Sequence, residues 1–317
     1  MTLSATDTIH RGLVNLRANW ELILVQFLQI LIGTVLFLVG FLPPLAVLGF
    51  SQLDFVDSSV ADWAAVMDSA AGLVTRGREA WLLLLASIIL SSVIWLMAIL
   101  VHCYFQGGIY GVLMAGDRQA PPGKPKSRPL FRTFSARNLR GWAARYLWRY
   151  FWLLNLFMLI GSVWLALPFV LFMLSVWGES RWGAGAALGI GCGGAIPVFF
   201  SLFVMVFWAS LSQADLAREE SSVMRATRQG LRVLGRRLGT VMILAVAGVI
   251  VWMTFAIAIT IFTTLVDFSS GAGTVLHLGW QLALTSAQWV FGSVIGMAYT
   301  SILVALVRCE MPREVVS

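Results

Sequence analysis

The amino-acid sequence predicts an all-α membrane protein, a polytopic bundle of six transmembrane helices. Of its 317 residues, 59% are hydrophobic and only 12% are charged, whereas soluble proteins have about 25% charged residues. Several uncharged stretches are longer than the roughly 20 residues that a helix needs to cross a hydrocarbon core about 30 Å thick. Because backbone polar groups in lipid must bond within their own segment, these stretches are expected to be helical.

The six spans belong to a single membrane domain over residues 1–317. They are expected at residues 20–42, 81–105, 148–177, 185–211, 240–266 and 276–307. The pair Pro43 and Pro44 is expected to end the first span, because proline lacks the amide donor that a continuing helix needs. Pro168 and Pro197 are the expected positions of kinks in the third and fourth spans.

Basic residues are distributed unevenly over the segments that flank the spans. The two terminal segments, the second loop and the fourth loop, together with Arg149, hold 19 of the 22 lysine and arginine residues. Basic residues concentrate on the cytoplasmic side of membranes, so both termini are expected to be cytoplasmic. The excess accounts for the net charge of +7, and it indicates anionic lipid headgroups rather than nucleic acid as partners. On the outer side, residues 58–74 have the spacing of a short amphipathic helix.

A basic amphipathic segment precedes each odd-numbered span, at residues 11–20, 136–148 and 228–238. The spacing of Gly12 and Leu13 matches that of Gly230 and Leu231. This pattern predicts three copies of an interfacial helix followed by a two-span hairpin, covering residues 1–115, 116–211 and 212–311. The alternative is that basic helices occur at these places in any protein that obeys the positive-inside rule.

The basic segments provide the residues expected to contact anionic lipid. These are Arg137, Arg140, Arg145, Arg225, Arg228, Arg232 and Arg236. In the third segment an apolar stripe lies beside the basic one, as interfacial helices require. The stripe consists of Met224, Leu231, Leu234 and Leu238.

Catalytic and metal-binding patterns are absent from the sequence. Residues 152–177, 185–211 and 240–266 contain no Asp, Glu, Lys, Arg or His, which weighs against a proton-coupled transporter. There is no HExxH motif, and the three cysteines are scattered without disulfide or metal-site spacing. We therefore expect no enzyme activity, cofactor or metal. Four polar residues are candidates for packing between helices or for lining a cavity, namely His102, Asn155, Gln281 and Gln288.

Two stretches carry a family resemblance. They are FQGGIYGVLMAGDRQAPP from Phe105 and LSQADLAREESSVMRATRQGLRVLGRRLGTVMIL from Leu211. Together they resemble the membrane domain associated with bacterial glycerophosphodiester phosphodiesterases and related stand-alone multi-span bacterial proteins. The resemblance implies a six-span bundle in a bacterial plasma (inner) membrane. It carries over no phosphodiesterase activity, which in the fused proteins belongs to a separate soluble barrel, and Gln229 or Gly230 stands where that pattern has a serine.

Two functions fit these observations. The first is a non-enzymatic integral membrane protein that is lipid-associated or an accessory subunit of a membrane complex. The alternative is a facilitator or exporter of a lipid or small amphiphile through a cavity between helical hairpins, with Pro168, Pro197, Gln281 and Gln288 lining or gating it. A continuous polar cavity reaching the middle of the membrane would distinguish the second function from the first.

Overall fold

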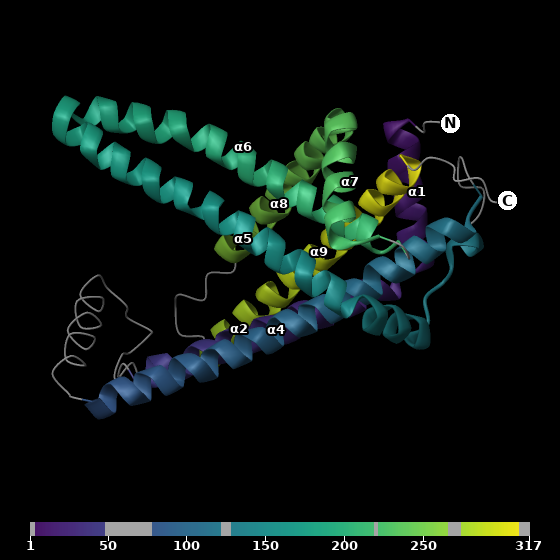
Figure 1. Cartoon of the computed structure of the whole chain (residues 1–317), viewed down its shortest axis with the longest axis horizontal. Helices are drawn as coiled ribbons and strands as arrows, with labels where there is room; N and C mark the ends of the chain where they lie inside the picture. Colours follow the sequence, from purple (N-terminus) through teal and green to yellow (C-terminus); the bar gives the residue numbers. More distant parts are fainter. Residues whose placement is uncertain (1–3, 48–77, 122–127, 219–220, 266–273, 311–317) are drawn as a thin grey trace. The chain divides into compact units, whose positions relative to one another are not determined.

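The computed structural model describes residues 4–47, 78–121, 128–218, 221–265 and 274–310. All regular secondary structure in these residues is helical (Figure 1). The helices are α1 (Ala5–Ala18), α2 (Glu21–Val47), α4 (Arg78–Gln119), the 3₁₀ helix η2 (Arg128–Phe131), α5 (Ala136–Trp182), α6 (Ala184–Leu216), α7 (Val223–Arg236), α8 (Leu238–Leu265) and α9 (Thr274–Cys309). The outer helix expected at residues 58–74 lies outside the described residues.

Six helices in the described part of the chain are long and apolar enough to cross a membrane, namely α2, α4, α5, α6, α8 and α9. They coincide with the six stretches that the sequence predicts. The prediction of an all-helical integral membrane protein is therefore confirmed. Four of these helices (α2, α4, α5 and α6) extend five or more residues past a predicted span end, because backbone hydrogen bonding continues where the apolar stretch has already ended.

The expected end of the first span at Pro43 and Pro44 is wrong. Helix α2 continues through both prolines and ends at Val47. The proline ring holds φ near −65°, which suits a helix, and its cost lies in the lost amide donor and the crowding of the preceding turn. Since only three residues follow Pro44 in the helix, that cost is confined to its final turns.

The helices that carry the three basic segments, α1, α5 and α7, begin in the same way. Each starts after a serine in an extended conformation, whose hydroxyl accepts a hydrogen bond from the backbone N–H three residues later; these serines are Ser4, Ser135 and Ser222. Such N-caps satisfy amide groups that have no partner within the helix. Helices α1 and α7 are separate 14-residue helices before their spans, whereas in α5 the basic segment and the span form one continuous helix.

The chain divides into two compact units, residues 28–102 and residues 1–27 with 103–317. In the first unit, α2 and α4 contact each other through Trp95. Its ring lies edge-on to Phe41 at 5.0 Å between centroids, and its indole N–H donates to the carbonyl of Phe37 at 3.3 Å. Aromatic side chains therefore hold this hairpin together.

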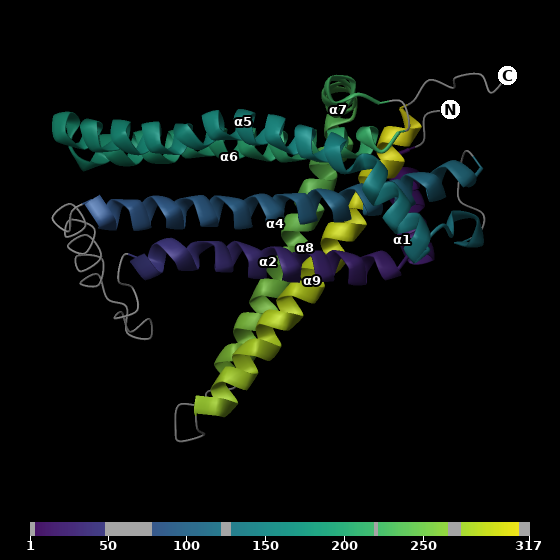
Figure 2. The ribbon, with the colours of Figure 1, turned by 60° about the horizontal axis from the view of Figure 1, so that its bottom comes forward.

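The larger unit contains two further hairpins, α5 with α6 and α8 with α9, whose helices run side by side in both views (Figure 2). Phe157 of α5 packs edge-on to Trp208 of α6 at 5.0 Å. Phe255 of α8 stacks on Phe291 of α9 at 3.7 Å between centroids. Such aromatic pairs contribute about 0.5–1.5 kcal/mol beyond the area that they bury.

Each basic segment packs against the second long helix of a pair. Helix α7 lies on α6, where Trp208 donates its indole N–H to the carbonyl of Thr227 at 2.9 Å. The first turns of α5 lie on the end of α4, where Leu139 and Trp142 contact α4 glycines. Helix α1 packs on α9, the last of the described helices. The three basic segments therefore make the same kind of contact, each with the second helix of a pair.

Candidate functional site

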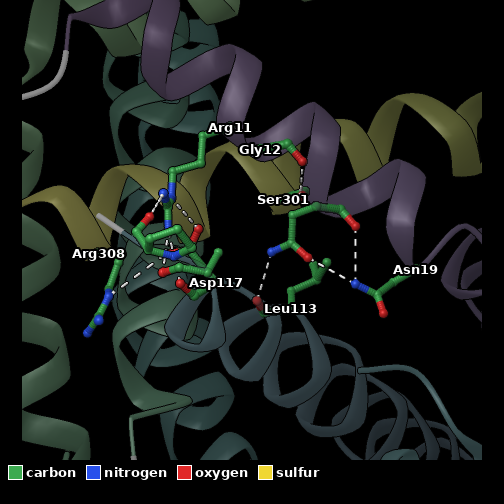
Figure 3. Close-up of polar contacts among 10 residues, drawn as sticks. Arg11, Gly12, Asn19, Leu113, Asp117, Ser301 and Arg308 are labelled. Carbon is green, nitrogen blue, oxygen red and sulfur yellow. Dashed lines mark hydrogen bonds and ion pairs between the residues drawn. The ribbon is translucent and has the colours of Figure 1, made fainter. Parts of the chain in front are cut away.

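A buried polar junction joins α1, α4 and α9 (Figure 3). Arg11 donates from Nε to Oδ1 of Asp117 at 2.7 Å and from Nη2 to the Asp117 carbonyl at 2.9 Å. The two side chains are 4% and 0% exposed. Arg308 of α9 lies on the other carboxylate oxygen, with 3.9 Å between Nε and Oδ2. The Arg11 guanidinium also lies over the ring of Phe131, 5.2 Å from its centroid.

The chemistry of this junction explains its composition. Taking a carboxylate and a guanidinium out of water costs several kcal/mol per ion, about as much as their attraction returns unless hydrogen bonds complete the geometry. Arg11 obtains such bonds from the carbonyls of Asp117 and Pro121, the latter at 2.9 Å. The arginine fork, with several donors in one plane, is suited to this arrangement.

Two asparagines extend the junction along α1. The Asn15 amide donates to the carbonyl of Leu113 in α4 at 2.8 Å. The Asn19 amide nitrogen donates to the carbonyl of Phe131, and its oxygen accepts from the backbone N–H groups of Thr133 and Phe134 at 3.0 and 2.8 Å. Through these bonds α1 holds both the end of α4 and the segment that leads into α5.

Close backbone contact holds α1 on α9. The hydroxyl of Ser301 donates to the carbonyl of Gly12 at 2.6 Å. A Cβ atom on Gly12 would lie 2.6 Å from Cα of Ile302, which real side chains do not tolerate. Glycine therefore permits the approach, and the hydrogen bond fixes the register of the two helices.

The side chains of α7 differ in burial around the helix. Its buried residues are Ala226, Thr227, Gly230, Val233 and Leu234, of which Thr227 and Gly230 contact α6. Two of its apolar residues outside this set, Met224 and Leu231, are exposed, as is Leu238 just after the helix. Leu234, which the sequence groups with them, is buried instead.

The seven arginines expected to contact lipid are all exposed in the structure; they are Arg137, Arg140 and Arg145 on α5 and Arg225, Arg228, Arg232 and Arg236 on α7. Three of them have neighbours on the protein surface. Arg145 lies over the Trp142 ring at 5.6 Å, Arg232 donates to the side chain of Gln229 at 3.3 Å, and Arg236 lies 3.8 Å from Glu310. The sequence therefore locates an exposed basic surface, and lipid contact by it stays a prediction.

The four polar candidates occupy different settings. His102 is within 2.7 Å of the Gln29 amide in the unit formed by residues 28–102. Asn155 donates to the carbonyl of Phe151 on its own helix at 2.8 Å. Gln281 and Gln288 are exposed on α9. A role in lining a cavity stays a prediction for all four.

Sequence reasoning missed Arg11, Asn15, Asn19 and Asp117. Arg11 and Asp117 are separated by 106 positions, so no local motif connects them. One signal was present, because Asn15 and Asn19 follow Arg11 at four-residue steps and therefore share one face of α1. Among the described residues, no group of three or more His, Cys, Asp or Glu side chains could hold a metal ion.

Comparison with known proteins returned no match. No family model, no curated protein and no solved structure matches this chain. The similarity to the membrane domain of the phosphodiesterases therefore stays an expectation from the two stretches quoted above.

Proposed function

We propose that this integral membrane protein associates with lipid through its basic helices, which bind anionic phospholipid headgroups at the cytoplasmic face of a bacterial plasma membrane. The observation that carries the proposal is the build of α7, where exposed arginines lie beside exposed apolar side chains on a helix docked to a membrane span. The proposed role is non-enzymatic, and attachment to a partner complex through the same surface is the second form that it can take.

The periodicity of α7 supports this role. Met224 and Leu231 are seven residues apart, which is about two helical turns, so they form one line along α7. Leu238, also exposed, follows just beyond the end of the helix. Arg228 and Arg232, at four-residue spacing, form a second line about a quarter-turn or less away. An interfacial helix needs this arrangement, with apolar side chains in the acyl boundary and cationic ones at the depth of the phosphates.

The packing of α1 supports the proposed orientation. Helix α1 contacts the C-terminal part of α9 at Gly12 and Ser301, so the first and last described helices meet at one end of the larger unit. An even number of spans returns the chain to the side from which it started. The concentration of basic residues at this end favours the cytoplasm.

The alternative, transport of a lipid or amphiphile, needs polar side chains that converge on a pathway. Asn155 bonds to its own helix, and Gln281 and Gln288 are exposed on α9. These settings favour lipid association over transport. Lipid flux in sealed vesicles that rises when the protein is added would reverse this preference.

The test removes charge from α7. Arg225, Arg228 and Arg232 are replaced together by glutamine, and the protein is reconstituted in nanodiscs of phosphatidylglycerol and phosphatidylcholine. The lipids that remain bound after release into mild detergent are counted by native mass spectrometry. We expect the preference for phosphatidylglycerol to fall by about 1 kcal/mol per charge removed.

The matched control replaces the same three arginines by lysine, which keeps the charge and alters the shape. The lysine variant is expected to retain most of the preference. An unchanged preference in the glutamine variant would refute the proposed function.

A further inference from the structure

Helices α1 and α7 share one register when residues are counted from their serine N-caps. Gly12 and Gly230 both stand eight residues after the cap, Ser4 and Ser222 respectively. Both glycines touch the backbone of a long helix, since a Cβ would lie 2.6 Å from Cα of Ile302 at Gly12 and 2.8 Å from N of Ser212 at Gly230. The helix ends also correspond, because the C-caps, Asn19 and Arg237, both stand fifteen residues after the N-cap.

The same register relates their exposed edges. Nine residues after the caps stand Leu13 and Leu231, which are 39% and 52% exposed. Sixteen residues after the caps stand Trp20 and Leu238, which are 48% and 43% exposed. Leu13 on α1 and Trp20 just after it therefore form an exposed apolar edge at the positions of Leu231 on α7 and Leu238 just after it.

The position of this edge next to a span identifies what covers it. Trp20 directly precedes α2, which begins at Glu21, and Leu238 is the first residue of α8. Both following helices are apolar enough to cross a membrane. A side chain at the junction of an interfacial helix and a span lies at the level where tryptophan prefers to reside, between headgroups and acyl chains.

Charge distinguishes the two edges. Beside the edge of α7 lie Arg225, Arg228 and Arg232, which are all exposed. Beside the edge of α1 lie His10 and Arg17, while Arg11 is buried against Asp117. The α1 edge therefore presents apolar surface with little positive charge.

Resting on the proposed function, we propose that α1 is a second membrane-contact helix, with Leu13 and Trp20 inserted among phospholipid acyl chains at the depth of Leu231 and Leu238. Its partner is phospholipid, whether its headgroup is neutral or anionic, whereas α7 selects anionic phospholipid.

The predicted threefold repeat gains support from the same register, since Ala143 stands eight residues after Ser135 and lies beside Gly107 of α4.

The test measures depth in the bilayer at matched positions. In a background with Cys103, Cys192 and Cys309 replaced, Leu13→Cys and Leu231→Cys are labelled with the fluorophore NBD. The proteins are reconstituted in phosphatidylcholine vesicles with and without phosphatidylglycerol. Quenching by brominated acyl chains reports contact with the hydrocarbon, and quenching by iodide reports contact with water.

A second matched pair provides the control. His10→Cys and Arg228→Cys stand six residues after the two caps and are exposed beside the apolar edges. We expect the label at 13 to be quenched by brominated lipid equally in both lipid mixtures. In the mixture with phosphatidylglycerol, the label at 231 should be quenched to within twofold of the label at 13. Labels at 10 and 228 should be quenched by iodide at least twofold more than the labels at 13 and 231.

The outcomes separate the two proposals. A label at 13 that iodide quenches while the label at 231 responds to brominated lipid would overturn the inference for α1 alone. Iodide quenching of both labels would overturn the interfacial placement of α7 as well, and with it the proposed function. Elution of each labelled variant as a single species from a sizing column establishes that it is folded.

Discussion

Arg11 and Asp117 form a buried ion pair with 2.7 Å between Nε and Oδ1, although 106 positions separate them in the chain. The pair attaches α1 to the end of α4, and Arg308 brings α9 to the same carboxylate. Helix α1 is thereby connected to the C-terminal part of α4 and to α9.

Replacing Asp117 by alanine is expected to destabilise the protein by about 3–5 kcal/mol, because it leaves the Arg11 guanidinium buried without its counter-charge. Thermal unfolding in mild detergent measures the loss, and limited proteolysis should cleave earlier within α1. Replacing both partners with apolar residues, Arg11→Met with Asp117→Leu, should restore most of the stability. Equal damage from the single and the double change would contradict an uncompensated charge as the cause.

Gly12→Ala is expected to destabilise the α1–α9 contact by about 1–3 kcal/mol through overpacking, because its Cβ would meet the Ile302 backbone. Gly230→Ala should destabilise the contact between α7 and α6 by a similar amount, because its Cβ would meet the Ser212 backbone. Gly235→Ala is the matched control, since nothing lies within 4 Å of a Cβ there and alanine suits a helix better than glycine. The melting temperatures of the three variants test this prediction. A decrease in melting temperature for Gly235→Ala as large as that for Gly12→Ala would contradict overpacking as the cause.

Asn19 is expected to be the most sensitive side chain at the junction between α1 and α2. Asn19→Ala leaves the partly buried N–H groups of Thr133 and Phe134 without their acceptor, at a cost of about 1 kcal/mol. Asn19→Asp keeps the acceptor and loses only the donated bonds, so it should cost less when urea unfolding of the two variants is compared. The reverse order would show that the amide donor matters more.

The ion pair of Arg237 with Glu310 should depend on salt more than that of Arg11 with Asp117. Arg237 Nε lies 2.5 Å from Glu310 Oε1, with the side chains 20% and 11% exposed. Glu310→Gln is expected to cost about 1 kcal/mol or less, and the loss should shrink as salt rises. The loss in Asp117→Ala should change little over the same salt range; a parallel response of both variants would contradict the difference in burial.

The apolar helices and the exposed basic surface could be predicted from the sequence, because both follow from local periodicity. An uncharged stretch of sufficient length must form a helix in lipid wherever the rest of the chain lies. The prolines show the limit of this reasoning, since Pro43 and Pro44 remain within α2. A rule based on local sequence gives the energetic cost of a proline within a helix, but it does not decide whether the helix continues through that proline.

The sequence by itself determined which segments are helices, which of these can cross a membrane and where positive charge gathers. Only the tertiary structure decided that Arg11 is buried while Arg17 is exposed, and that Leu234 is buried while Leu231 is exposed. The physical reason is that helical periodicity places a side chain on a face of its own helix. The neighbour that covers that face is α9 for Gly12 and α4 for Arg11, both of them far away in the chain and brought there by packing.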